Sequence, residues 1–510
     1  MTRYGEIDWR LATGDWRLAS GREMNVAGKK ILVMGAARSG IACAKFLVAR
    51  GATVALNDAQ PFEKWSAEAL GLKSNGVGIL PGEVPGWLLD NLDLVVISPG
   101  VPTKAIPLRY AERAGAEVIG EVELASRYLK GRIVAITGTN GKTTTTTLIG
   151  EILKDAGVPT LVGGNIGTPL ISLVEKSRDD GWTVVEVSSF QLETIEEFHP
   201  TVALVLNVTP NHMDRYESFT DYAAAKHRIF MNQGPGDVAI LNADDEIVSS
   251  WAGGLQAHVA KFSVERQLDE GLFLRGREIV SRTATRERVL LTSNEMKLRG
   301  RHNVENVLAA LAAGLACGAA PESMRETIRR FEPVEHRLEF VSEIEGVKFY
   351  NDSKATSVDA TLKALEAFAD EDQEETGKIV LILGGRGKKA SYAPLASLIQ
   401  KRARRLVLIG EDADTIANEL GQFAPNERAR DMNEAVTLCF QASQPGDVVL
   451  LAPACASFDM FESFEHRGKV FKDEVSSLEF RVSSSKTNHE IEHPGEPENS
   501  KLETRNSKLT

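Results

Sequence analysis

The chain has 510 residues, of which 43% are hydrophobic and 25% are charged, a composition typical of a soluble enzyme with roughly three domains. Its formal charge of −12 argues against nonspecific binding to nucleic acid, so local lysines, helix ends and metal ions must hold any anionic ligand. The four cysteines are too widely spaced for a CxxC motif, and we expect neither a secretory leader nor a membrane-spanning segment, which predicts a protein of a reducing compartment without a membrane partner.

Both ends of the chain are expected to lie outside the folded domains. The segment that begins at Asp8 recurs almost verbatim directly after itself, and a regular strand pattern begins only after Met24. We therefore predict that residues 1–27 form a flexible extension, of which residues 1–23 are either non-essential or a misassigned start. Residues 483–510 are rich in Ser, Glu, Asn, Lys and Pro with few apolar anchors, which predicts a disordered tail.

Residues 28–121 alternate strand and helix patterns, which predicts an α/β, Rossmann-like domain with a parallel sheet. The expected elements are strands over residues 30–35, 53–58 and 94–98 and a helix over residues 41–50. The first turn, Gly35 to Gly40, resembles a dinucleotide fingerprint, and Asp58 ends the next strand, where a ribose-binding acid is expected. Ala37 replaces the middle glycine, which disfavours nicotinamide binding relative to a nucleotide-sugar site or plain packing of helix on sheet.

A glycine-rich loop, Thr-Gly-Thr-Asn-Gly-Lys-Thr-Thr over residues 137–144, follows an apolar strand and precedes a helix pattern that begins near Thr145. Backbone N–H groups of such a loop bind phosphate oxygens, Lys142 adds a mobile charge, and Thr143 offers a hydroxyl to Mg²⁺. Ile136 stands where the first glycine of a full P-loop belongs, so the loop is a shortened variant. An ordinary Gly/Thr-rich turn is the alternative, but the strand, glycines, Lys-Thr pair and helix together favour ATP binding.

Residues 122–332 contain this loop and form the predicted central P-loop-type ATPase domain with a parallel sheet. Strand patterns over residues 182–187 and 202–208 bring Glu186 and His212 to strand ends, where open α/β sheets bind ligands. Taken singly, each side chain is more simply explained as a hydrogen-bonded strand-end carboxylate or loop histidine. Together with the loop, they suggest metal ions held beside the phosphates.

Two polar residues of this domain lie in segments that favour helix. Lys226 follows three alanines, where a lone lysine is by default a solvated surface group. The apolar, alanine-rich segment 304–317 predicts a core helix, and Asn306 near its start either faces a base or serves as a cap or turn residue.

Residues 333–482 predict a second Rossmann-like domain at the C-terminal side. Its expected strands cover residues 347–350, 379–383, 406–409 and 448–451. The turns that follow them carry lysine and hydroxyl donors that suit a small dianion, with ordinary loop polarity as the alternative: Lys354, Thr356, Lys388 and Ser457.

Eight segments resemble the ordered motifs of the Mur ligases and extend over roughly residues 28–475. They are GTNGKTTT (138–145), GGNIG (163–167), EVSSFQLE (186–193), NVTPNHMDRY (207–216), HNVENVLAA (302–310), EHRLE (335–339), NDSKATSVDAT (351–361) and APACASFDMFESFEHRG (452–468). The resemblance implies a cytoplasmic, ATP-driven amide ligase, expected to be monomeric, that forms an acyl phosphate in peptidoglycan precursor synthesis. EVSSFQLE and PACASFD favour the addition of D-glutamate to UDP-N-acetylmuramoyl-L-alanine over the addition of L-alanine, a diamino acid or D-Ala-D-Ala.

The resemblance also implies roles for individual residues. It implies that Lys142, Glu186, His212 and Lys226 are catalytic residues. It also implies that two Mg²⁺ ions are bound by Thr143, Glu186, His212 and a carbamylated Lys226. ATP contacts fall to Gly138, Thr139, Asn140, Gly141, Lys142, Thr143, Thr144, Asn306, Arg337, Asp352 and Lys354. The uridine-diphosphate substrate falls to Arg38, Ser39, Asp58, Ser98, Gly100, Asn165 and His212, and D-glutamate to Thr356, Lys388, Ser457 and Phe464.

The chain departs from the family pattern at two positions. Ala37 replaces a glycine in the uridine loop, which affects the diphosphate geometry, and Arg386 replaces an acidic residue close to Lys388, which bears on affinity in the last domain. Three other functions remain as alternatives: a plain P-loop NTPase or kinase, a nucleotide-binding regulatory protein, and a ligase for another amino acid. Intact Lys142, Glu186, His212 and Lys226 argue against an inactive regulator.

Overall fold

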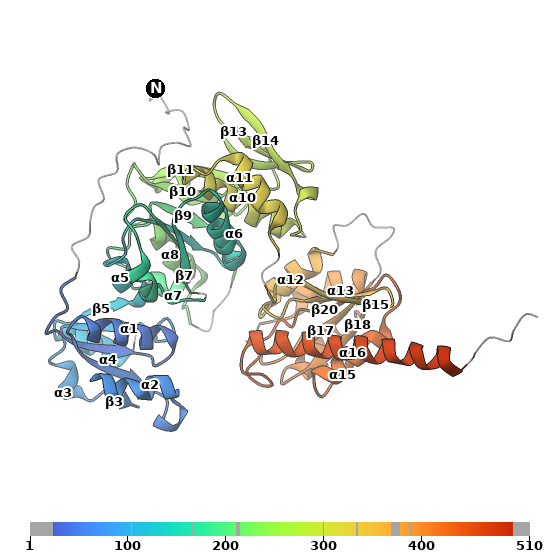
Figure 1. Cartoon of the computed structure of the whole chain (residues 1–510), viewed down its shortest axis with the longest axis horizontal. Coiled ribbons are helices and arrows are strands. Elements are labelled where there is room, and N and C mark those ends of the chain that lie inside the picture. The colour runs from blue at the N-terminus through green and yellow to red at the C-terminus, as the bar shows by residue number, and fades with distance from the viewer. Residues whose placement is uncertain are drawn as a thin grey trace, which may run out of the picture. The chain divides into compact units, whose positions relative to one another are not determined.

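A computed structural model shows an α/β protein with three sheets, which confirms the predicted fold class (Figure 1). The structure describes residues 24–103, 105–165, 167–210, 215–298, 300–332, 335–368, 378–387 and 390–492. The chain divides into two compact units, one up to Val334 and one from Glu335 onward. The first unit holds two of the sheets and the second unit holds the third. The N-terminal repeat at Asp8 lies outside the described residues.

The first sheet has the strand order β3-β2-β1-β4-β5, and all neighbouring strands are parallel. Its strands are β1 (Lys30–Met34), β2 (Thr53–Asp58), β3 (Gly78–Pro81), β4 (Leu94–Ile97) and β5 (Glu117–Gly120). Its helices are α1 (Arg38–Ala49), α2 (Ala67–Gly71), α3 (Gly86–Leu89) and α4 (Ile106–Arg113), followed by α5 (Glu121–Ser126). Helix α1 begins earlier than the predicted Ile41, because Ala37 has an extended conformation and serves as its N-cap.

The central sheet has the strand order β14-β13-β12-β11-β10-β9-β6-β8-β7. Its strands are β6 (Arg132–Thr137), β7 (Thr160–Gly164), β8 (Trp182–Glu186), β9 (Val202–Val205), β10 (Val238–Asn242), β11 (His258–Ser263), β12 (Gly271–Arg275), β13 (Glu278–Arg282) and β14 (Glu287–Thr292). The expected parallel pairing holds from β7 to β12, whereas β12, β13 and β14 form antiparallel hairpins at one edge. Strand β9 ends at Val205 instead of the predicted Val208, because the following residues turn toward the phosphate loop.

Helices of the central domain pack on both sides of this sheet (Figure 1). They are α6 (Lys142–Asp155), α7 (Ser189–Leu192), α8 (Phe219–His227), α9 (Glu246–Ser250), α10 (Arg301–Ala316) and α11 (Pro321–Arg330). Short 3₁₀ segments are η2 (Phe62–Lys64), η3 (Leu72–Asn75), η4 (Leu170–Lys176), η5 (Arg228–Phe230), η6 (Trp251–Gly254), η7 (Ser293–Glu295) and, in the second unit, η8 (Ala393–Leu395). The small residues of α10 allow close packing on α6, where a Cβ at Gly314 would lie only 3.0 Å from Ile152. This packing confirms the predicted core helix.

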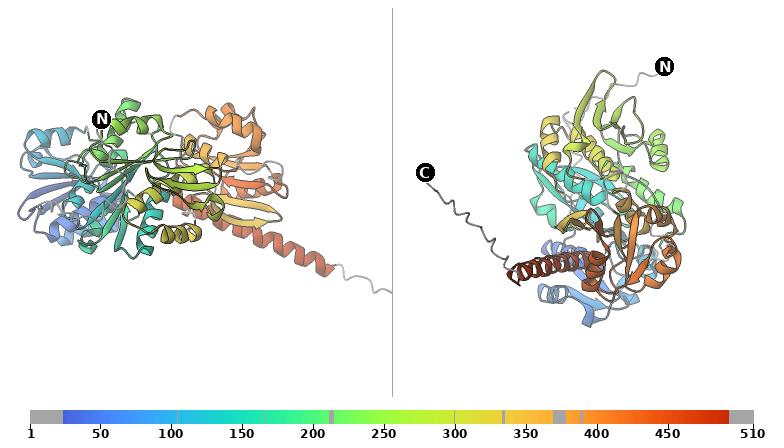
Figure 2. Two further views of the ribbon diagram at one scale, coloured as in Figure 1. Left: turned by 90° about the horizontal axis from the view of Figure 1, so that it is seen from above. Right: turned by 90° about the vertical axis from the view of Figure 1, so that its right-hand side faces the viewer.

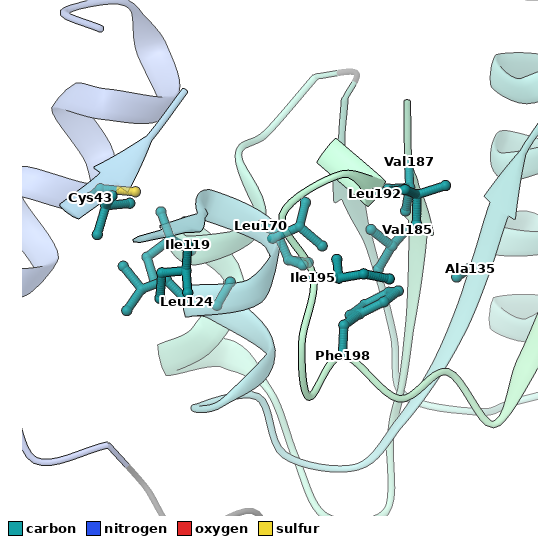
Figure 3. Close-up of a cluster of buried hydrophobic side chains, with 14 of the residues drawn as sticks. Cys43, Ile119, Leu124, Ala135, Leu170, Val185, Val187, Leu192, Ile195 and Phe198 are labelled. Carbon is teal, nitrogen blue, oxygen red and sulfur yellow. The ribbon is translucent and has the colours of Figure 1, made fainter. Parts of the chain in front are cut away.

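A continuous hydrophobic core joins the first sheet to the central sheet. Side chains of α1, β5, α5 and η4 meet there, among them Cys43, Ile119, Leu124 and Leu170 (Figure 3). Because helix α5 begins directly after β5, the chain passes between the two sheets through this shared core.

The sheet of the second unit has the order β15-β16-β20-β17-β18-β19, with only β15 antiparallel to its neighbour. Its strands are β15 (Glu339–Ile344), β16 (Val347–Asn351), β17 (Ile379–Gly384), β18 (Ala403–Ile409), β19 (Asn426–Arg428) and β20 (Val448–Leu451). Its helices are α12 (Val358–Glu366), α13 (Ala396–Arg402), α14 (Ala413–Leu420), α15 (Met432–Ala442) and α16 (Phe464–Glu492). Helix α16, drawn in red in Figure 2, runs past the predicted boundary at 482, since a helix nucleated by packing extends at little cost.

Candidate active site

The phosphate loop connects β6 to α6, as the sequence predicts. Gly138 and Gly141 both have positive φ, 155° and 81°, and Gly141 is the N-cap of α6. The helix therefore begins at Lys142, three residues before the predicted start near Thr145. The first backbone N–H groups of this helix have no partner within it, so the loop and the helix end together favour an anion.

Asn207, which the sequence analysis did not assign, fixes the loop from the end of β9. Its Oδ1 accepts hydrogen bonds from the backbone N–H groups of Thr139 (3.1 Å) and Asn140 (2.8 Å). The Lys142 ammonium donates to the carbonyl oxygens of Gly138 and Thr139, each at 2.8 Å. The signal that identifies Asn207 is its place at the start of the NVTPN segment, directly after a buried strand.

Glu186 lies at the foot of the loop, 2% exposed at the end of β8. Its carboxylate accepts hydrogen bonds from the Thr143 hydroxyl and from the Asn165 amide, both at 3.0 Å. The hydroxyl of Thr144 is buried and has no hydrogen-bond partner among the described residues. The predicted approach of Glu186 to the loop is therefore present, Asn165 joins them, and the group gathers oxygen donors of the kind that Mg²⁺ prefers.

Lys226 is 2% exposed, so the expectation of a solvated surface lysine is wrong. The side chain comes from the inward face of α8, donates to the Gly138 carbonyl at 2.8 Å, and lies 4.6 Å from the centre of the Tyr222 ring. Burial lowers the pKa of Lys226 well below its ordinary value, nearby Lys142 lowers it further, and Glu186 opposes the shift. These influences together favour the neutral amine over the ammonium more than solvent exposure would.

Of two other residues predicted to bind ligands at this site, the structure describes Asn306 but not His212. His212 lies outside the described residues, and its position stays a prediction. Asn306 is buried in the second turn of α10, accepts a hydrogen bond from the Thr145 hydroxyl at 3.3 Å and is bonded to Asn303, so it is not a helix cap. It packs against the phosphate loop at Gly141.

Five of the predicted residues for the uridine-diphosphate substrate lie at the carboxyl edge of the first sheet, beside β1: Arg38, Ser39, Asp58, Ser98 and Gly100. This strand lies between β2 and β4, so the direction of the strand order reverses next to it, where doubly wound sheets bind ligands. The Asp58 carboxylate accepts the N–H of Ala36 at 2.8 Å, and the Ser98 hydroxyl lies 3.4 Å from the Gly35 carbonyl oxygen. Arg38 and Ser39 begin α1, and the Arg38 guanidinium donates to the Gly167 carbonyl at 3.3 Å.

The second unit carries its own polar cluster behind β16. Asp352 is buried, one of its carboxylate oxygens has no partner among the described residues, and burial raises its pKa to about 6 while Arg337 opposes the shift. Lys354 lies 5.3 Å from the centre of the Phe464 ring. Thr356 follows on the same turn, and Ser457 is buried after β20. Lys388 lies outside the described residues.

Arg467, which the sequence analysis also did not assign, is fully buried in this cluster. Its guanidinium donates to the Ser353 carbonyl (2.8 Å), the Ser353 hydroxyl (3.0 Å) and the Cys455 carbonyl (3.2 Å). It therefore ties the loop after β16 to the loop after β20. A buried arginine was hidden in the sequence because α16, where it lies, is polar on average.

The two departures from the family pattern have local structural partners. Ala37 is exposed at the first turn, where its extended backbone needs no glycine. Arg386 forms a bidentate ion pair with Glu411, at 2.9 and 3.1 Å, and its backbone is bonded to Ala456. The negative charge of Glu411 on the neighbouring loop thus balances the positive charge that Arg386 introduces.

Three further features of the described residues concern metal binding, thiol chemistry and membrane insertion. The cluster Glu335, His336 and Glu339 has metal-ligand geometry, but Lys472 already supplies the cation, 2.6 and 2.9 Å from the two carboxylates. The four cysteines are free thiols, and three of them are buried. Among the helices described here, none has the length and apolar character needed to cross a membrane.

Family models match most of the folded chain. Residues 29–120 match the Mur ligase MurD-like N-terminal domain, residues 136–314 the Mur ligase middle domain, and residues 336–455 the Mur ligase glutamate ligase domain. The three matched segments correspond in order to the three sheets.

Similar proteins carry a consistent name. A protein of Pelotomaculum thermopropionicum is 48% identical over 450 residues, covering 88% of this chain and 97% of its own, and one of Solibacter usitatus is 48% identical over 448 residues, covering 88% and 98%. Both are named UDP-N-acetylmuramoylalanine--D-glutamate ligase.

Solved structures share the fold at lower sequence identity. A pseudomurein peptide ligase type C from Methanothermus fervidus has a TM-score of 0.56 at 18% identity, covering 88% of this chain and 100% of its own. MurF from Acinetobacter baumannii has a TM-score of 0.54 at 18% identity, covering 89% and 92%. The three domain matches and the relatives at 48% identity together show that the chain belongs to the Mur ligase family, among the members named UDP-N-acetylmuramoylalanine--D-glutamate ligase.

Proposed function

We propose that the protein is an ATP-dependent ligase that adds D-glutamate to UDP-N-acetylmuramoyl-L-alanine in peptidoglycan precursor synthesis. The observation that carries the proposal is the buried group of Thr143, Glu186 and Lys226 around the phosphate loop, in a chain of this family. A plain phosphate-binding loop has no need of a buried lysine beside a buried carboxylate.

The reaction joins two anions before it forms the amide. An oxygen of the substrate carboxylate attacks the γ-phosphorus of ATP, ADP leaves, and an acyl phosphate results. The amine of D-glutamate then attacks the acyl carbon, inorganic phosphate leaves, and the amine loses a proton. Lys142 and the helix N-terminus offset the charge of the phosphates, so the protein contributes mainly positioning and electrostatic stabilisation.

The oxygen donors beside the loop fit Mg²⁺, which would supply positive charge to the phosphates. Thr143 and Glu186 would hold one ion, and His212 with a carbamylated Lys226 would hold a second. The lowered pKa of Lys226 supports this assignment, because CO₂ reacts with the neutral amine and converts a cation into an anionic oxygen ligand. Carbamylation would remove the Lys226 ammonium from the Gly138 carbonyl, which keeps the Lys142 ammonium as a donor.

The remaining assignments concern the contacts to ATP, D-glutamate and the uridine-diphosphate substrate. The ATP contacts Gly138, Thr139, Asn140, Gly141 and Thr144 belong to the loop, and Asn306, Arg337, Asp352 and Lys354 complete the nucleotide site. The orphaned oxygen of buried Asp352 supports a ligand there. We propose that Thr356, Lys388, Ser457 and Phe464 bind D-glutamate, that the protein is a cytoplasmic monomer, and that the uridine-diphosphate site lies beside β1.

The test measures phosphate release from ATP and Mg²⁺ with UDP-N-acetylmuramoyl-L-alanine, with each amino acid substrate supplied or omitted in turn. We expect release to require D-glutamate and to yield the amide. Lys142→Ala should lower kcat by about 10²–10³-fold, as removal of one charge-stabilising donor does. Lys154→Ala, at the exposed far end of the same helix, is the matched control and should retain activity. Release that is indifferent to D-glutamate would indicate a phosphate-binding ATPase instead.

Carbamylation can be tested separately with ¹³C-labelled bicarbonate. The wild type should show a carbamate carbon resonance that Lys226→Met lacks and Lys154→Met retains. An unchanged resonance in Lys226→Met, or none in active wild-type protein, would contradict the assignment.

A further inference from the structure

We propose that Arg215 and Glu193 are positioning residues that grip the loop of residues 98–103 and hold it in register with the phosphate loop, so that the nucleotide-sugar substrate binds in line with ATP. This inference rests on the proposed function, which places Ser98 and Gly100 of this loop at the substrate. Neither Arg215 nor Glu193 is among the residues assigned above to ligands.

Arg215 grips the loop from one side. Its guanidinium donates to the Pro99 carbonyl at 3.2 Å and to the Val101 carbonyl at 2.9 Å, so both neighbours of Gly100 are held by one planar group. The guanidinium carbon also lies 4.0 Å from the centre of the Phe190 ring, on α7. This combination of two hydrogen bonds and ring stacking fixes its plane.

Glu193 grips the same loop farther along. One of its carboxylate oxygens accepts the Thr103 hydroxyl at 2.9 Å, and the other accepts the Tyr216 hydroxyl at 2.6 Å. Tyr216 follows Arg215 directly in the chain and stacks on Phe190, with ring centres 5.7 Å apart. Tyr216 therefore links Arg215, its neighbour in the chain, to Glu193, with which it forms a hydrogen bond.

The same network continues to the phosphate loop. Tyr216 packs edge-on against Tyr222, with ring centres 5.2 Å apart. The Tyr222 hydroxyl lies 3.1 Å from the Thr139 hydroxyl in the phosphate loop, and the Tyr222 ring lies beneath Lys226. A chain of direct contacts thus joins the loop at Gly100 to the loop that is proposed to bind ATP.

The charge of Arg215 suits an anionic substrate. Backbone carbonyl oxygens repel phosphate and carboxylate groups, and here two of them, on either side of Gly100, are committed to the guanidinium. Gly100 itself is exposed, and a Cβ on it would meet no atom within 4 Å. The loop therefore presents an open glycine beside a positive charge.

The experiment compares Arg215→Ala, Arg215→Lys and Glu193→Gln with the wild type, measuring the KM for each of the three substrates and the direct binding of UDP-N-acetylmuramoyl-L-alanine by calorimetry. We expect Arg215→Ala to raise the KM and Kd for this substrate at least tenfold and the KM for D-glutamate less than twofold. Arg215→Lys, which keeps the charge but not the planar fork, should give an intermediate loss. Added guanidinium ion should partly restore binding to Arg215→Ala.

Arg228→Ala is the matched control. Its guanidinium also bonds two carbonyls of the neighbouring segment, those of Leu192 (2.8 Å) and Ile195 (2.6 Å), but does not bond the loop at Gly100. It should lower stability to urea without a selective change in substrate affinity. If Arg215→Ala raises all three KM values alike, or leaves the Kd unchanged, the positioning role is overturned. If the proposed function itself is wrong, the wild-type protein will neither bind the nucleotide sugar nor need D-glutamate. That result distinguishes failure of the proposed function from failure of the positioning role.

Discussion

At the scale of single residues, the phosphate loop depends on a glycine at its last position. Gly141 has a φ of 81°, and a Cβ there would collide with the Asn306 amide oxygen from α10. The left-handed conformation alone costs another residue roughly 1–2 kcal/mol. The close approach of α10 therefore excludes side chains in addition to the conformational demand.

Gly141→Ala should consequently lose ATP binding while the protein remains folded. The displaced loop can no longer direct its N–H groups at phosphate, so we expect a rise of at least tenfold in the Kd for ATP, measured by calorimetry. Gly157→Ala is the control, because Gly157 has a similar φ of 77° but open space around it. That variant should lose about 1 kcal/mol of stability and no ATP affinity. Equal affinities in both variants would contradict the steric argument.

At the scale of elements, a buried carboxyl joins α5 to η4, two elements whose apolar side chains Leu124 and Leu170 are labelled in Figure 3. Glu121 is 2% exposed and accepts the Ile171 N–H at 2.8 Å, while its other oxygen has no partner among the described residues. Burial raises the pKa of Glu121 from 4.5 to about 7, and burial together with Glu121 raises the pKa of the Cys43 thiol. The protonated acid is therefore the form that the fold prefers.

This preference predicts a pH dependence of stability. Because the folded pKa of Glu121 lies above the unfolded value, folding gains from protonation at low pH and loses that gain as the pH rises from 4.5 to about 7. The shift corresponds to about 3 kcal/mol in the free energy of unfolding. The free energy of unfolding of Glu121→Gln and of wild type is measured by urea unfolding across this pH range. The difference between variant and wild type should shift in favour of the variant by about 3 kcal/mol as the pH rises from 4.5 to about 7. Glu112→Gln, at an exposed position of α4, is the control for the substitution itself, and a flat difference for Glu121→Gln would refute the prediction.

At the scale of the whole molecule, the proposed ligands of ATP are divided between the two compact units. The phosphate loop and Asn306 belong to the first, whereas Arg337, Asp352 and Lys354 belong to the second. A nucleotide that contacts both groups favours a closed arrangement, since ligands stabilise the state that they bind more tightly. We expect the hinge near Pro333, which lies outside the described residues.

We expect closure when ATP binds. The radius of gyration measured by small-angle X-ray scattering should fall when a non-hydrolysable ATP analogue and Mg²⁺ are added to the wild type. Lys142→Ala, which lacks the phosphate charge partner, should need a higher analogue concentration for the same change. Identical scattering curves with and without saturating analogue would count against a hinge motion.

The sequence by itself determined the features that depend on local pattern. Continuous apolar runs placed the buried parallel strands, and the loop at residues 137–144 could be identified because its glycines, lysine and flanking strand and helix are adjacent in the chain. The family motifs added the proposed roles of Glu186 and Lys226. The start of α6 was misplaced, because threonines at residues 143–147 have low helix propensity and the capping conformation of Gly141 overrides it.

Only the tertiary structure decided which polar groups are buried and what they contact. Lys226 looks like a surface residue in its own helix, and Arg467 lies in a helix that is polar on average, yet both are enclosed by loops from distant strands. The grip of Arg215 on the loop at Gly100 joins residues more than a hundred positions apart. Burial and long-range hydrogen bonds follow from how sheets and helices pack, so a local reading of the sequence gives no signal for them.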